Sequence, residues 1–270
     1  TPMLKRDGHI HTPFCPHGTT DTLRQYAEEA IKKGFQSITF TEHAPLPPSF
    51  TDPTPQKDSA MAQASLERYI NEISGLKKEY RGQLNIRTGL EVDYIAEYED
   101  EIKSFLNTYG PFLDDSILSV HFLRTSSSYL CLDYDEHTFK KLISECGSIE
   151  AVYELYYRSI YSSIVASLGA YKPKRVGHIT LVKKFIRLFP YKMSDHIRRL
   201  ASECLNAVKE NGMELDFNTS GLRKTYAGNI YLEDWMMEAA KQKNIPLVFG
   251  SDAHQAGDVG YAYEKFTELR

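Results

Sequence analysis

Residues 37–43 read Ser-Ile-Thr-Phe-Thr-Glu-His, a run of β-branched and aromatic residues that ends in two side chains able to bind metals. Such a composition favours a buried strand, and we predict one over Ser37–Thr41 that runs into Glu42 and His43. The segment before it predicts a strand over Lys5–His11 and a helix over Thr22–Lys33. The beginning of the chain is therefore a strand–helix–strand unit.

The same alternation continues to residue 249. The first helix has Thr20 or Asp21 as its expected N-cap and Gly34 as its expected stop. Further strands are predicted over Asn85–Glu91, Ser116–His121, Arg175–His178, Met213–Phe217 and Leu247–Phe249. Further helices are predicted over Ala60–Tyr80, Glu136–Ser144, Ile149–Leu168, Ser194–Asn211 and Leu232–Lys243. This pattern predicts an α/β fold whose parallel strands form a closed or nearly closed barrel.

The composition fits one soluble domain over residues 1–270, with the Pro-rich stretch 45–55 as a barrel loop. Hydrophobic residues make up 41% and charged residues 25%, and the formal net charge is −4. That charge gives no global attraction to nucleic acid or anionic lipid. The four cysteines form no CxxC pair, and no apolar run is long enough to span a membrane. We expect a cytoplasmic protein that binds neither membranes nor nucleic acid; its oligomeric state stays open.

Histidines and carboxylates gather at the ends of the predicted strands. His9 and His11 are two residues apart, so they point to the same side of a strand and can bind one ion together. The carboxyl ends of barrel strands meet on one face, where active sites lie. The candidate ligands on that face are His9, His11, His17, His43, Glu91, His121, His178, Asp252 and His254. Such a set predicts two or three divalent ions of zinc, manganese or iron.

A second candidate feature is the loop that follows Met213–Phe217. It carries Asn218, Ser220 and Arg223, which offer an amide, a hydroxyl and a guanidinium to a phosphate group. Arg158 is a further candidate cation for the substrate. The alternative is a solvated basic loop with no ligand.

Other candidate residues have more ordinary explanations. Glu42 is a candidate partner that orients a histidine ligand. Cys15 lies between ligands, although a plain buried cysteine is the simpler interpretation. His137 and His196, in predicted helices, are interpreted as ordinary helix residues.

Several motifs together resemble the polymerase and histidinol phosphatase (PHP) family. They are DGHIHTPFCPHGTTD (7–21), FTEH (40–43), GLEVDY (89–94), SVHF (119–122), GHIT (177–180) and SDAH (251–254). The stretches NTSGLRK (218–224) and HAPLP (43–47) look like its histidinol-phosphate phosphatase branch. The resemblance implies a distorted (β/α)7 TIM-like barrel, a trinuclear metal centre, and hydrolysis of L-histidinol phosphate in histidine biosynthesis.

The resemblance also implies a division of the ligands. His9, His11, Glu91 and Asp252 would hold one ion, and Glu91 would bridge to a second ion held by His121 and His178. His17, His43 and His254 would hold the third. Asp252 or His254 would protonate the leaving alkoxide, and Arg223 would hold phosphate oxygens.

Two alternatives remain at this stage. A phosphodiesterase or nuclease of the same family could use the same metals, but it would want a basic groove with stacking aromatics. A metal-binding module without activity would be expected to lack a ligand or a proton-transfer residue, and no such gap is seen.

Overall fold

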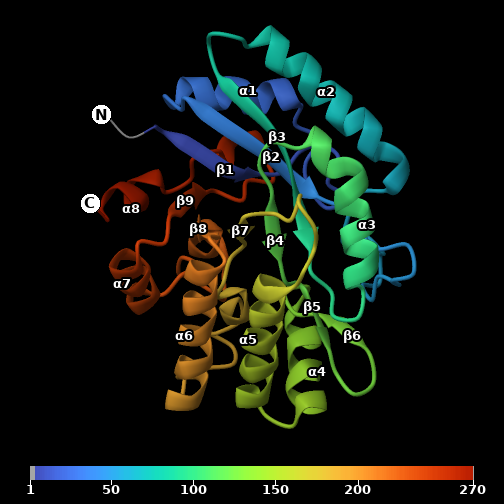
Figure 1. Cartoon of the computed structure of the whole chain (residues 1–270). Helices are drawn as coiled ribbons and strands as arrows, with labels where there is room; N and C mark the ends of the chain where they lie inside the picture. The colour runs from blue at the N-terminus through green and yellow to red at the C-terminus, as the bar shows by residue number, and fades with distance from the viewer. Residues whose placement is uncertain (1–3, 270) are drawn as a thin grey trace.

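The computed structural model describes residues 4–269 and contains a parallel, nearly closed barrel of seven strands (Figure 1). The strands follow the order β1-β2-β3-β4-β7-β8-β9, and all neighbours are parallel. A parallel bridge between Ile10 and Ala253 brings the two outer strands together. The seven strands are β1 (Arg6–Ile10), β2 (Ser37–His43), β3 (Asn85–Asp93), β4 (Ile117–Ser119), β7 (Arg175–Val176), β8 (Glu214–Asn218) and β9 (Leu247–Gly250). The predicted barrel is confirmed.

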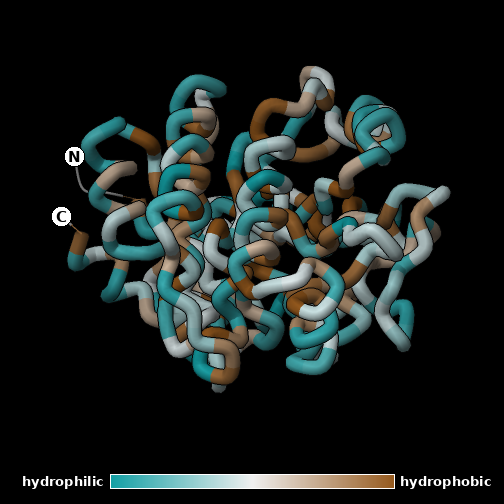
Figure 2. Tube along the Cα trace, turned by 90° about the horizontal axis from the view of Figure 1, so that it is seen from below, coloured by the Kyte–Doolittle hydropathy of each residue, from teal (hydrophilic) through white to brown (hydrophobic). Residues whose placement is uncertain are grey.

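Helices surround the strands and bury an apolar face against them. Figure 2 shows hydrophilic residues along the outer turns of the peripheral helices, as expected for amphipathic helices on a barrel. The helices are α1 (Leu23–Lys32), α2 (Leu66–Glu79), α3 (Glu99–Tyr109), α4 (Glu136–Cys146), α5 (Ile149–Val165), α6 (Asp195–Glu210), α7 (Asp234–Lys243) and the short α8 (Tyr263–Thr267). None of these helices is both long and apolar enough to cross a membrane.

Local boundaries differ from the prediction at the first two helices. Thr22, rather than Thr20 or Asp21, caps α1: its hydroxyl accepts from the Gln25 amide, and the Gln25 side chain accepts from the Thr22 amide. This reciprocal pair is a capping box. The helix expected from Ala60 begins only at Leu66, after one 3-10 turn.

The prediction missed α3 and a hairpin formed by β5 (Phe122–Arg124) and β6 (Tyr129–Cys131). The hairpin follows β4 at once, so its residues resembled a continuation of that strand and the loop after it. Leu132 donates its amide to the His121 carbonyl at 2.9 Å, which fixes the hairpin beside the C-terminal end of β4.

A buried ionic network fills the opposite, N-terminal end of the barrel. The Arg175 guanidinium is fully buried and donates to Asp115 (3.0 and 3.1 Å), Glu214 (2.8 Å) and the Gly8 carbonyl (2.8 Å). Burial would raise the pKa of Asp115, but Arg175 and Arg6 beside it lower that pKa to about 2. The network ties β1, β7 and β8 together and leaves the C-terminal end of the barrel for the site.

Candidate metal centre

Glu91, near the C-terminal end of β3, lies at the centre of the histidine cluster. Its side chain is 1% exposed, and five imidazoles surround it. Oε1 lies 3.5 Å from His9, 3.4 Å from His11 and 3.4 Å from His43. Oε2 lies 3.1 Å from His178 and 3.6 Å from His121. The ends of four strands, β1, β2, β4 and β7, thus bring imidazoles to the carboxylate that β3 carries.

Asp252 forms a second focus, directly after β9. Its Oδ1 lies 2.9 Å from Nε2 of His11 and 3.3 Å from Nε2 of His9. The backbone amide of Asp252 donates to the His9 carbonyl at 2.7 Å, so β1 and the segment after β9 are joined at the site itself. Asp252 has φ +54°, a left-handed conformation that an aspartate tolerates at a cost.

Several facing atoms in this cluster lack hydrogen-bond geometry, although they are close. Nε2 of His9, Nε2 of His11, Nδ1 of His43 and Oδ1 of Asp252 are buried without a hydrogen-bond partner among the described residues. Unpartnered buried polar atoms are costly. A divalent cation would satisfy the lone pairs of the nitrogen and carboxylate atoms at once. The donor set therefore fits divalent metal ions.

Potential ligand atoms fall into three groups within the described chain, each with its atoms within 4.8 Å of one another. These groups are His9–His11–Asp252, His43–Glu91–His121 and His11–Cys15–His43–His254. The resemblance placed His43 with His17 and His254 alone. In the structure His43 shares one group with His254 and a second group with Glu91 and His121, and its Nδ1 lies beside Glu91.

Buried carboxylates hold the Nδ1 atoms of three of these histidines. His9 contacts Asp216 at 2.9 Å, His11 contacts Glu42 at 3.1 Å, and His121 contacts Asp93 at 2.5 Å. Such partners fix the tautomer and turn Nε2 of each ring towards the metals. Glu42 was expected in this role; Asp93 and Asp216 were missed. The sequence did contain a signal for both residues. Asp93 lies two residues after Glu91, and Asp216 lies two residues before Asn218, so each points to the same side of its strand as that candidate site residue.

The surroundings set the pKa values of the cluster. Burial and the nearby His11 lower the pKa of His43 to about 3, so its ring is neutral, the form that binds metals. Burial would lower the pKa of His121, but Asp93 and Glu91 raise it to about 10. Burial would raise the pKa of Glu42, but His11 lowers it to about 2.

His17, His254 and Cys15 lie on the outer side of the cluster. The His17 ring centroid is 5.5 Å from that of His254 and 5.3 Å from that of His43. Nδ1 of His254 is bonded to the Asp252 carbonyl at 2.9 Å, and its ring stacks on His11 with centroids 4.0 Å apart. Cys15, buried, lies 3.5 Å by its sulfur from Nδ1 of His17. All nine predicted ligand-type residues lie in one region.

The three residues predicted to contact phosphate at the end of β8 and after it, Asn218, Ser220 and Arg223, lie in different surroundings. Asn218 is buried and donates to Asp216 (3.0 Å) and Asp252 (3.1 Å), so it positions site carboxylates. Ser220 lines the cavity. Arg223 does not line it: its guanidinium donates to the carbonyls of Ser251 and Asp252, both at 2.9 Å.

Arg158 lies outside the site. It is on the solvent-facing side of α5, its side chain is 60% exposed, and it pairs with Glu154 one turn away. The helix turns it away from the barrel, because Tyr156, two residues earlier, points inward to the His178 carbonyl. This placement corrects the expectation that Arg158 contacts the substrate.

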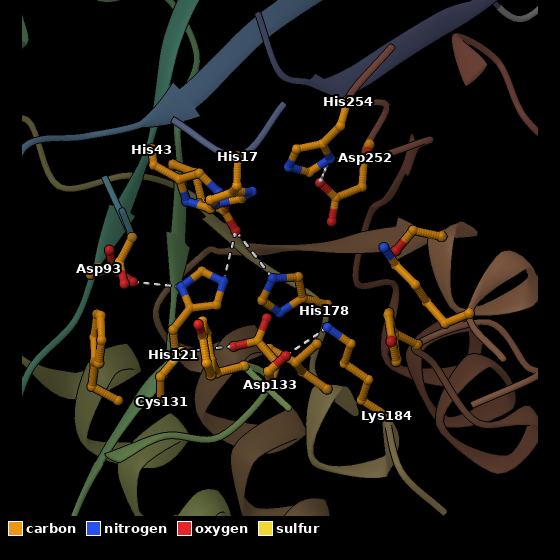
Figure 3. A pocket seen from close by; sticks show the side chains of 18 of the residues that line it. His17, His43, Asp93, His121, Cys131, Asp133, His178, Lys184, Asp252 and His254 are labelled. Carbon is orange, nitrogen blue, oxygen red and sulfur yellow. Dashed lines mark hydrogen bonds and ion pairs between the residues drawn. The ribbon is translucent and has the colours of Figure 1, made fainter. Parts of the chain in front are cut away.

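A cavity of about 370 Å³ opens above the cluster (Figure 3). Two lysines reach it, Lys184 from the segment after β7 and Lys224 from the loop after β8. Figure 3 shows Asp133 and Lys184 on one side of this space and His17, His43 and His254 on another. The remaining lining residues include Asp58, Ser59, Phe122, Cys131, Tyr134, Leu181, Ser220 and Tyr231.

Comparison with known proteins places this arrangement in context. The family described as the PHP domain matches residues 7–220, and that described as PHP-associated matches residues 236–270. The chain is 87% identical to a histidinol-phosphatase from Bacillus subtilis, over 98% of this chain and 99% of the relative.

Two solved structures share the fold. The crystal structure of a candidate histidinol phosphatase from Listeria monocytogenes has a TM-score of 0.94 and 36% identity, covering 97% of this chain and 100% of that one. The structure of histidinol phosphate phosphatase from Lactococcus lactis, complexed with zinc, L-histidinol and phosphate, has a TM-score of 0.73 and 21% identity. It covers 99% of this chain and 94% of that one, and at this identity it supports the fold alone.

Proposed function

Because this chain belongs to the PHP-domain family, we propose that it is a metal-dependent phosphomonoesterase that hydrolyses L-histidinol phosphate to L-histidinol and phosphate, a step of histidine biosynthesis. One observation carries the reaction class: five imidazoles lie within 3.6 Å of the Glu91 carboxylate, at the open end of a barrel. The name of the Bacillus subtilis relative supports the substrate.

The cofactors we propose are two or three divalent ions of zinc, manganese or iron. Their ligands would be His9, His11, His17, His43, Glu91, His121, His178, Asp252 and His254. When bound, such ions lower the pKa of a water molecule and neutralise the charge of the phosphate group. Glu91 would be shared between ions, because its two oxygens face different histidines.

The chain's own groups then orient the substrate and move a proton. The alkoxide that leaves phosphorus is a poor leaving group and needs a proton, and Asp252 and His254 are the candidate donors at the cavity. Asn218 holds Oδ2 of Asp252 at 3.1 Å and so limits its rotation. Lys224 and Ser220, which line the cavity, are placed to meet phosphate oxygens.

The described residues also support our proposal that the chain is a single domain. The matches to the two family descriptions meet in the barrel, because the segment directly after β9 bonds to the end of β1. Asp252 and His254, after β9, share their ligand groups with His9 and His11 from the first strand and the turn after it.

A panel of substrates tests the function. Metal-loaded protein should release phosphate from L-histidinol phosphate with a higher kcat/KM than from simple phosphate monoesters, and should leave a phosphodiester intact. Elemental analysis should find two or three equivalents of metal. Preferred cleavage of the phosphodiester, or at most one equivalent of metal after incubation with zinc or manganese, would overturn the proposal.

A further inference from the structure

Asp133 is an acidic residue in the cavity whose carboxylate accepts a hydrogen bond only from the Cys131 thiol among the described residues. Burial would raise its pKa, but the nearby His121, Lys184 and His178 lower that pKa to about 2, so the group is a carboxylate. It lies two residues after the end of β6, and the bond from the Leu132 amide to the His121 carbonyl holds it beside the histidine cluster. It belongs to none of the three groups of ligand atoms found in residues 4–269. A role other than metal binding is therefore open to it.

The contacts of Asp133 leave one carboxylate oxygen available. Oδ1 accepts a weak hydrogen bond from the Cys131 thiol at 3.2 Å. The ammonium group of Lys184 donates to the backbone carbonyl of Asp133 at 2.6 Å, not to its carboxylate. Oδ2 has no hydrogen bond or ion pair within the described part of the chain, and the half-buried side chain lines the cavity near His121 and His178 (Figure 3).

The cavity thus offers two kinds of charge. Lys224 and the ions that the cluster would hold suit an anionic phosphate, whereas Asp133 suits a cation close to it. Lys184 also lines the cavity, but it donates to the backbone carbonyl of Asp133 and leaves the carboxylate without an ion pair among the described residues. In L-histidinol phosphate the ammonium nitrogen is only two carbons from the ester oxygen, so its binding group must lie next to the phosphate site. Asp133 lies there, because it lines the same cavity as His121 and His178, and the residue before it, Leu132, bonds to the His121 carbonyl.

We propose that Asp133 binds the ammonium group of the substrate and selects aminoalkyl phosphates over phosphate monoesters that lack an amine. This inference rests on the proposed function. The ammonium group is preferred to the imidazole because an alkylammonium is charged at neutral pH, whereas an imidazole with a pKa of about 6.5 is mostly neutral. A charged hydrogen bond is stronger than a neutral one.

Three substrates and the variant Asp133→Asn test the proposal. The substrates are L-histidinol phosphate, its deamino analogue imidazolylpropyl phosphate, and an aminoalkyl phosphate without the ring. Asp133→Asn should lower kcat/KM for both amine-bearing substrates by about 10- to 100-fold, mainly through KM. For the deamino analogue, kcat/KM should stay within about twofold of the parent. Metal content should be unchanged.

Each other result overturns the inference. Equal losses on all three substrates, or a loss of metal, would mean that Asp133 supports the metal centre. A loss confined to the two imidazole-bearing substrates would assign it to the ring. A selective loss in Asp58→Asn, with none in Asp133→Asn, would assign the ammonium group to the loop after β2. Parent protein that releases no phosphate from any monoester would instead refute the proposed function.

Discussion

Replacing Arg223 by methionine tests whether this residue holds phosphate or holds the protein's own backbone. The guanidinium donates to the carbonyls of Ser251 and Asp252 at 2.9 Å each, and its Nε faces Asp258 at 3.4 Å. The side chain is 17% exposed. We expect Arg223 to fix the segment that presents Asp252 and His254.

The size of the effect follows from these contacts. A hydrogen bond from a charged donor contributes about 1.5–3 kcal/mol, and two are lost. A left-handed non-glycine residue, as Asp252 is, costs about 1–2 kcal/mol, which the surroundings must offset. We therefore expect Arg223→Met to lower the free energy of unfolding by about 3 kcal/mol. Metal affinity should fall about 10-fold or more, as for loss of other orienting groups.

Urea unfolding of the metal-free protein measures the first effect, and a zinc titration measures the second. Lys224→Met is the matched control. Lys224 is the next residue after Arg223, and its side chain lines the cavity and makes no hydrogen bond among residues 4–269. That control should weaken inhibition by inorganic phosphate and leave stability unchanged. Arg223→Lys should recover only part of the stability, because an ammonium group lacks the planar fork.

One pattern of results would refute this reasoning. If Arg223→Met keeps its stability and metal affinity but loses phosphate inhibition about 10-fold, roughly 1.4 kcal/mol, the guanidinium reaches the substrate after all.

Three further predictions concern the centre and the barrel. Glu91→Gln should lower kcat/KM more than His17→Ala at saturating metal, because an amide cannot bridge two cations; steady-state kinetics decides, and near-normal turnover in Glu91→Gln would exclude a bridging role. Asp93→Asn should weaken metal binding about 10- to 100-fold by releasing the His121 ring, as measured by chelator competition, and unchanged affinity would contradict this. Asp115, with a pKa of about 2 against an ordinary 3.8, should stabilise the fold fully above about pH 4. That contribution, about 2 kcal/mol, should be lost as the pH falls through about 2. The urea midpoint of Asp115→Asn should therefore depend less on pH over this range than the midpoint of the parent protein.

The barrel could be predicted from the sequence because the strands are apolar and the helices have clear ends. The run 37–43 reads as a strand, and β2 covers it completely. The missed elements have weaker signals. The helix α3 follows β3 after a short turn, with no N-cap hydrogen bond to mark its start, and the hairpin strands β5 and β6 have three residues each.

The placement of the candidate ligands could be anticipated because parallel strands end on one face. The direction of individual side chains could not. Arg223 lies in the expected loop, yet it donates to the backbone carbonyls of Ser251 and of the left-handed Asp252. Gly250 illustrates the same limit: a Cβ there would lie 2.4 Å from Asp216 and 2.6 Å from His9, a crowding visible only in three dimensions.

The junction between β1 and the segment after β9 sets the order in which the protein can mature. Asp252, whose amide bonds to the His9 carbonyl, is synthesised 243 residues after His9. Until that segment leaves the ribosome, the nascent barrel has an open seam with an unpaired edge along β1, a surface prone to wrong pairing. Asp252, which the group with His9 and His11 requires, is then absent. Metal binding at that group is thus expected only after the segment whose backbone bonds close the seam has been made.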